Sequence, residues 1–414
     1  MEQCRAVSKS SAEPFSLVSN ARLHGRDGFF HLTIRDGLLE KIEASSEPID
    51  PAEGFDAKGG LVTPPFVDPH FHLDSVYSLE ETGQNRSGTL LEGIALWKAY
   101  KESLTPEQII NRARRYCEEA IRFGLQAIRS HVDVSYESGA GVKGLLALQK
   151  EFAGRLDIQL VAFPQDGLFR NPNGEAWLLE ALDAGVDLIG GIPHFERTYE
   201  EGARSVDWIC RTAAERGIRV DLHCDETDDG ASHHIETLAA KTVEYGLVGK
   251  TAASHTTSLH SAEDAWFAKL LPLLVEAGIT VIPNPLINLT LQGRFDGYPK
   301  RRGITRIPEL DQAGVPVALG QDCVRDPWYP LGTGNLLDVA HFTVHASQMT
   351  GTEEMDRLLP MITTHGADAM GLEGYALKEN EPAHLLVFEA ETFSEILRYR
   401  SKPKLILRGG KAVG

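Results

Sequence analysis

The segment PPFVDPHFH, residues 64–72, is an apolar run that ends in the pair His70 and His72. Residues two apart in a strand point to the same side, so both imidazoles can reach one metal ion. Seven more apolar runs follow it, each with enough chain behind it for a helix. The eight runs lie at roughly residues 62–72, 125–134, 157–165, 186–195, 218–226, 251–257, 279–285 and 315–322. Eight strand–helix units predict an α/β fold, a (β/α)8 TIM-type barrel, over residues 63–374.

Helical stretches separate the runs, and a different pattern occupies the chain ends. In the stretch Ala262 to Ala277, apolar residues recur at helical spacing, and Pro272 predicts a kink or split there. Short alternating runs near both ends of the chain predict small antiparallel strands. We therefore expect residues 1–62 and 375–414 to form a small β-sandwich domain, with Met1 to Pro14 as a loose tail.

The composition argues against several kinds of partner and location. The 414 residues carry 41 Lys and Arg against 59 Asp and Glu, a net charge of −18. Such a surface repels phosphate backbones, so a small-molecule base is a better partner than a nucleic-acid polymer. The five cysteines form no CxxC pair, which predicts a reducing, cytoplasmic location. No run reaches the ~18 apolar residues of a membrane span, so no membrane contact is expected.

Polar residues gather where the runs end, the edge of a TIM-type barrel that carries its active site. Glu226 lies at the end of the fifth run and His255 at the end of the sixth. Three imidazoles and one carboxylate form a candidate metal-ligand set: His70, His72, His223 and Asp322. This donor set suits zinc or iron(II), and we expect one such divalent ion per subunit.

The same residues predict a hydrolytic reaction. A divalent metal lowers the pKa of water and makes hydroxide available near neutral pH. Asp322 could accept the proton of the water, and His255 could orient the hydroxide. Glu226 could carry a proton to a ring nitrogen and then to the leaving amine. The expected chemistry is attack on an amidine-like carbon, with ammonia leaving.

Motifs along nearly the whole chain resemble those of the bacterial cytosine deaminase family of the amidohydrolase superfamily. They are PPFVDPHFHLD (64–74), SGTL (87–90), VAFPQ (161–165), IPHFE (192–196), HCDE (223–226), ASHTT (253–257), NPL (284–286), LQGRFDGYPKRRG (291–303) and DPWYP (326–330). The resemblance implies one iron or zinc on the four ligands above, Glu226 as the proton shuttle and His255 beside the attacking hydroxide. It also implies a homo-oligomer, frequently a hexamer.

The resemblance also implies contacts to the substrate. Gln165 would hydrogen-bond the ring carbonyl, the backbone of Leu90 would meet the ring edge, and Trp328 would help to close the pocket. A strand-end cap is the alternative for Gln165, and core packing is the alternative for Trp328.

The chain departs from that family around the metal aspartate. Gln321-Asp322-Cys323 stands where these enzymes usually carry His-Asp-Asp. Cys323 replaces a carboxylate that would lie near ring position 5, and a thiol is small and largely apolar. We therefore expect 5-substituted cytosines, 5-methylcytosine first, to be accepted as well as or better than cytosine. A neutral packing change is the alternative for Cys323.

The sequence leaves other functions open. Another small amino-heterocycle, such as isoguanine, creatinine or an amino-s-triazine, could be the substrate. An amidohydrolase that removes alkylamines from triazines would share the metal-ligand set. It would not be expected to have both the sequence around Glu226 and the motif at 291–303. A non-catalytic scaffold is disfavoured by the complete ligand set. The small zinc deaminases of nucleosides are excluded, because their PCxxC motif is absent.

Overall fold

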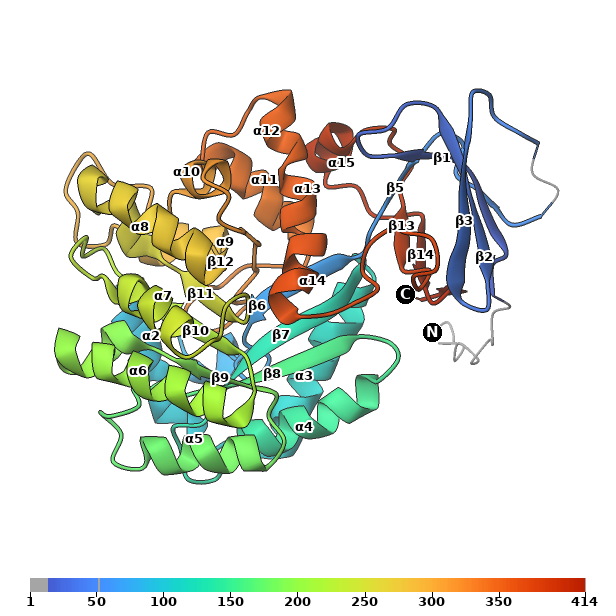
Figure 1. The fold of residues 1–414 in the computed structure, drawn as a ribbon. Helices are drawn as coiled ribbons and strands as arrows, with labels where there is room; N and C mark the ends of the chain where they lie inside the picture. The colour runs from blue at the N-terminus through green and yellow to red at the C-terminus, as the bar shows by residue number, and fades with distance from the viewer. Residues whose placement is uncertain (1–13, 51–52, 414) are drawn as a thin grey trace. The chain divides into compact units, whose positions relative to one another are not determined.

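Parallel strands form the centre of the larger of two units in the computed structural model, which describes residues 14–50 and 53–413 (Figure 1). Seven strands pair in parallel, each with the next in the chain. They are β6 (Phe66–Phe71), β7 (Leu125–Asp133), β8 (Asp157–Phe163), β9 (Leu188–Gly191), β10 (Val220–Cys224), β11 (Thr251–His255) and β12 (Thr280–Ile282). Every residue of β7 is buried, as expected for a sheet covered on both faces.

The eighth expected strand, residues 315–322, closes the barrel through isolated bridges rather than as a regular strand. Val317 bridges β12 and Asp322 bridges β6, both in parallel. Between these points the N–H of Leu319 donates to the carbonyl of Met361, outside the sheet, at 2.8 Å. The segment is irregular because its backbone divides its hydrogen bonds between the sheet and a helix. The predicted (β/α) barrel is confirmed.

Helices surround these strands in Figure 1. They are α1 (Leu79–Thr82), α2 (Leu90–Lys101), α3 (Pro106–Ile121), α4 (Ala140–Phe152), α5 (Gly174–Asp183), α6 (Tyr199–Arg216), α7 (His234–Glu244), α8 (Asp264–Ala277), α9 (Pro285–Leu291), α10 (Ile307–Gln312), α11 (Leu336–Ala346), α12 (Thr352–Asp356), α13 (Leu358–Met361) and α14 (Thr364–Met370), with 3-10 turns at Pro193–Phe195 and Thr257–His260. A capping box between Thr105 and Gln108 starts α3, with Pro106 at its first position. α8 continues through Pro272 as one helix, so of the expected kink or split the split does not occur. None of the described helices has the length and hydrophobicity to cross a bilayer.

The smaller unit is β structure built from both ends of the chain. It contains the described residues up to Pro65, residues 374–396 and those from Ser401 onward. Its strands are β1 (Leu17–Leu23), β2 (Phe29–Arg35), β3 (Leu38–Ser45), β4 (Phe55–Asp56), β5 (Leu61–Thr63), β13 (Leu385–Val387), β14 (Leu405–Arg408) and β15 (Lys411–Ala412). They pair in the order β15-β14-β13-β5-β1-β2-β3, with β4 beside β1.

One hydrophobic core joins the two chain ends in the smaller unit. Leu32 and Val62 from the N-terminal strands share it with Leu385 and Leu407 from the C-terminal strands. Helix α15 (Phe393–Tyr399) has residues in both units. Residues 1–13, most of the expected loose tail, lie outside the described part of the chain.

Candidate active site

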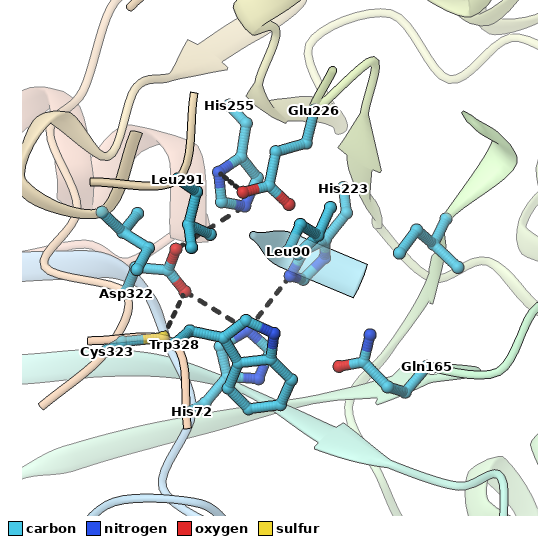
Figure 2. A pocket seen from close by; sticks show the side chains of 12 residues that line it. His72, Leu90, Gln165, His223, Glu226, His255, Leu291, Asp322, Cys323 and Trp328 are labelled. Atoms are coloured by element: carbon cyan, nitrogen blue, oxygen red, sulfur yellow. Dashed lines mark hydrogen bonds and ion pairs between the residues drawn. The ribbon is translucent and has the colours of Figure 1, made fainter. Parts of the chain in front are cut away.

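Three imidazoles and one carboxylate meet at the carboxyl ends of the barrel strands, and Figure 2 shows His72, His223 and Asp322 of this set. His70 belongs to β6, His72 follows that strand, His223 lies on β10, and Asp322 ends the eighth segment. One ligand-type atom from each residue lies within 4.8 Å of the others, and all four residues are buried. His72 Nε2 is 3.3 Å from Asp322 Oδ1 and 3.0 Å from His223 Nε2. The structure thus brings together the four predicted ligands.

These four side chains fit a bound divalent cation. Burial lowers the pKa of His72 to about 3 and holds the pKa of His223 well below its usual range. Both rings are therefore neutral at pH 7, the form that binds metals. His70 Nε2 is buried and makes no hydrogen bond, with Asp322 Oδ1 3.4 Å away. A buried nitrogen without a partner is costly, and a cation among these atoms would satisfy it.

Glu226 and His255 lie beside this set on the same rim of the barrel. His255 Nδ1 is 3.4 Å from Glu226 Oε1, and His255 Nε2 is 3.8 Å from Asp322 Oδ2. Burial, followed by repulsion from Asp322, raises the pKa of Glu226 well above its usual range. Glu226 is therefore a carboxyl group that can carry a proton near neutral pH.

An asparagine that the sequence analysis missed holds the His255 ring. Asn288, on α9, donates from Nδ2 to His255 Nδ1 at 3.0 Å. The NPL motif at 284–286 marks only the start of this helix, and Asn288 lies one turn beyond Asn284. That helical spacing is the signal that could have indicated it.

The rim residues hold an uncommon backbone conformation. φ is +52° at Asp225, +69° at His255 and +68° at Asp322, in the left-handed region that few non-glycine residues occupy. Each costs on the order of 1–3 kcal/mol and persists only where the surroundings enforce it. Asp225 is enforced by its carboxylate, which accepts from the N–H of Ile235 at 2.8 Å. This anchor fixes the turn that presents Glu226.

A small hollow opens beside the ligand set, and His72, His223 and Asp322 form part of its wall. Its walls include the four residues predicted to meet substrate: Leu90, Gln165, Cys323 and Trp328. They also include three apolar residues that the sequence analysis did not name: Ile192, Ile287 and Leu291. Ile192 and Leu291 lie in the motifs at 192–196 and 291–303. They could not be assigned to the site from the sequence, because an apolar residue at either position could equally belong to the hydrophobic core.

Cys323 contributes an uncharged group to the wall of the hollow. Its side chain is 3 % exposed, and its Sγ donates to Asp322 Oδ1 at 3.5 Å. Burial, with the carboxylates of Asp322 and Asp326, raises the pKa of this thiol well above its usual range. Gln321, the other departure, does not line the hollow; its Nε2 donates to the Cys323 carbonyl at 3.2 Å.

A buried polar chain supports the first ligand. His70 Nδ1 lies 2.8 Å from Ser254 Oγ, which donates to Asp221 Oδ1 at 2.8 Å. Arg129 Nη1 donates to Asp221 Oδ2 at 2.8 Å. Such partners fix the tautomer and orientation of a metal-binding imidazole. This polar chain was not predicted from the sequence, although Asp221 lies two residues before His223 and so points to the same side of its strand.

Comparisons with known proteins agree with this geometry. A family described as the amidohydrolase family matches residues 53–413. The crystal structure of 5-methylcytosine deaminase from Klebsiella pneumoniae, liganded with 5-fluorocytosine, is 41% identical in sequence. The likeness covers 96% of this chain and 97% of that chain, with a TM-score of 0.94.

Two curated relatives extend the comparison. N-isopropylammelide isopropyl amidohydrolase from Pseudomonas sp. is 27% identical over 96% of this chain and 96% of its own length. Pterin deaminase from Rhizobium rhizogenes is 28% identical over 92% of this chain and 87% of its own length. Because the family match spans most of the sequence, the chain belongs to the amidohydrolase family.

Proposed function

We propose that this protein is a metal-dependent deaminase that converts 5-methylcytosine to thymine and ammonia and takes cytosine as a second substrate. The observation that carries the proposal is the neutral thiol of Cys323 in the wall of the hollow, next to Asp322. If ring position 5 faces Cys323, a 5-methyl group is buried there, which is worth about 0.8 kcal/mol. The 41% identity to a 5-methylcytosine deaminase supports the same substrate class.

The reaction exchanges a C–N bond for a C–O bond. Water adds to ring carbon 4, the bond to the exocyclic nitrogen breaks, and ammonia leaves. Zinc or iron(II), one ion per subunit on the four ligands, would lower the pKa of water enough for attack at neutral pH. Asp322 accepts the proton of the water, and His255 orients the attacking oxygen. Glu226 donates its proton to ring nitrogen 3, takes up the remaining proton of the added hydroxyl group and passes it to the leaving nitrogen. The proton held by Asp322 then returns to Glu226.

The remaining wall residues bind the ring. We assign Gln165 to the ring carbonyl, the backbone of Leu90 to the ring edge, and Trp328 to closure of the hollow. Each lines the hollow, which supports a role in binding. We also propose that the protein is a homo-oligomer, as its family resemblance implies, which a mass from light scattering would test.

A substrate screen tests the proposed function. The metal-loaded protein would be assayed for ammonia release from 5-methylcytosine, cytosine, isoguanine, creatinine and amino-s-triazines, with zinc and with iron(II). We expect 5-methylcytosine to give the highest kcat/KM. Alkylamine removal from a triazine is the second candidate, because the relative that is named for it matches nearly the whole chain. Release of isopropylamine from N-isopropylammelide, with no ammonia from either cytosine, would overturn the proposal.

A further inference from the structure

One buried ammonium group lies outside the lining of the hollow and has no part in the chemistry above. Lys101, the last residue of α2, is 1 % exposed. Its Nζ donates to Asp133 Oδ2 at 2.8 Å and to Asp166 Oδ2 at 3.1 Å. Burial opposes the charge, but the two carboxylates raise the pKa of Lys101, so the ammonium stays charged. Because buried charges are costly unless paired, these three side chains hold one another in a single arrangement.

The two carboxylates belong to the ends of neighbouring barrel strands. Asp133 ends β7, and Asp166 directly follows Gln165 in the loop after β8. Ser135 links them, because its N–H donates to Asp133 Oδ1 at 2.8 Å and its Oγ accepts from the N–H of Asp166 at 3.0 Å. Lys101 is therefore coupled, through Asp166, to the backbone that carries Gln165.

The other end of α2 forms part of the wall of the hollow. Leu90, its first residue, lines the hollow. Gly93 lies so close to Trp328 that a Cβ atom on it would be 2.3 Å from Trp328 Cδ1. Trp97 donates from Nε1 to Asp133 Oδ2 at 2.9 Å, and its ring centroid is 6.3 Å from that of Trp328. Helix α2 thus connects the buried ammonium group of Lys101 to the wall of the hollow.

We propose that Lys101 is a positioning residue. Through Asp133 and Asp166 it fixes the distance between α2 and the loop that carries Gln165, and the planar base binds between these two parts. This inference rests on the proposed function, which supplies the base. Lys101 contacts none of the residues assigned to proton transfer. Its loss should weaken binding of the substrate and the transition state alike, which raises KM and leaves kcat nearly unchanged.

The test compares Lys101→Met with Lys98→Met in the metal-loaded enzyme, with 5-methylcytosine as substrate. Lys98 is a matched control, because its Nζ lies 3.2 Å from the same Asp166 oxygen while its side chain is 64% exposed. Lys101→Met should raise KM about tenfold or more with kcat within about threefold, and Lys98→Met should change neither by more than about twofold. Lys101→Arg restores the charge and should recover part of the loss. Equal KM values for the two methionine variants, or a fall in kcat at unchanged KM, would overturn the proposal.

A second readout does not depend on turnover. Near-UV circular dichroism reports the packing of Trp97 and Trp328, and it should change in Lys101→Met but not in Lys98→Met. An inactive wild type would refute the proposed function, whereas an unchanged near-UV spectrum of Lys101→Met would refute the positioning role. If far-UV circular dichroism shows that Lys101→Met does not fold, Asp166→Asn takes its place. Asp166→Asn should raise KM in the same direction by a smaller factor, and an unchanged KM and spectrum would overturn the proposal.

Discussion

Replacing Cys323 by Asp should remove the proposed preference for 5-methylcytosine over cytosine. The new carboxylate would lie where the thiol is now, at a site 3 % exposed and with Sγ 3.5 Å from Asp322 Oδ1. Two carboxylates about 4 Å apart repel by about 4 kcal/mol at an effective dielectric constant near 20, so the new group needs a water or a proton. A 5-methyl group would displace that water, and a buried polar group without its partner costs about 1–3 kcal/mol.

The lost burial of the methyl group adds about 0.8 kcal/mol to this cost. Together the two effects predict that the ratio of kcat/KM for 5-methylcytosine over cytosine falls by about 20- to 500-fold, at ~1.4 kcal/mol per factor of ten. The assay is steady-state ammonia release from each base, with wild type and variant at equal metal content. Cys323→Ser, which stays small and neutral, should keep the ratio within about threefold. A ratio unaffected by Cys323→Asp, or a wild type that strongly prefers cytosine, would show that Cys323 does not set the preference at ring position 5.

Three further predictions follow from the site. Glu226→Gln should keep its metal but lose about 10²–10⁴-fold in kcat. If the variant keeps the kcat of the wild type, another residue transfers the proton. Elemental analysis should find one zinc or iron ion per chain. Asp221 is the acidic residue that could serve a second metal ion, but Arg129 already pairs with it at 2.8 Å and neutralises its charge. Two tightly bound ions per chain would contradict this prediction. Burial raises the pKa of Asp326 to about 6, above its unfolded value of about 3.9, so the contribution of Asp326 to the stability of the fold falls as the pH rises from about 4 to about 6. In metal-free protein the Tm of Asp326→Asn, relative to wild type, should therefore rise over that window, and a Tm difference that is constant with pH would count against it.

The barrel and its ligand set could be predicted because both depend on local patterns. Apolar runs separated by helical stretches indicate the barrel, and polar residues at their ends indicate its catalytic face. His70 and His72 follow from strand periodicity alone. The irregular eighth segment could not be foreseen, because the hydrogen bond that draws Leu319 from the sheet goes to Met361, distant in the chain.

The supporting residues were missed because their partners are set by tertiary structure. Asp133 ends the second run in the pattern His131-Val132-Asp133, much as the first run ends in His70-Phe71-His72. That pattern could have marked Asp133, but its buried partner Lys101 lies on a helix 32 residues away in the chain. A lysine in the last turn of a helix is ordinarily a solvent-exposed residue, and only the packed fold shows this one to be buried.

Hydrolytic deamination of 5-methylcytosine can be followed by mass spectrometry of the product formed in ¹⁸O-labelled water. The metal-loaded wild type would be incubated with 5-methylcytosine in that water, and ammonia would be measured in the same sample. We expect thymine that carries one ¹⁸O atom, with one ammonia released for each thymine formed. Unchanged 5-methylcytosine, or thymine without the label, would contradict it.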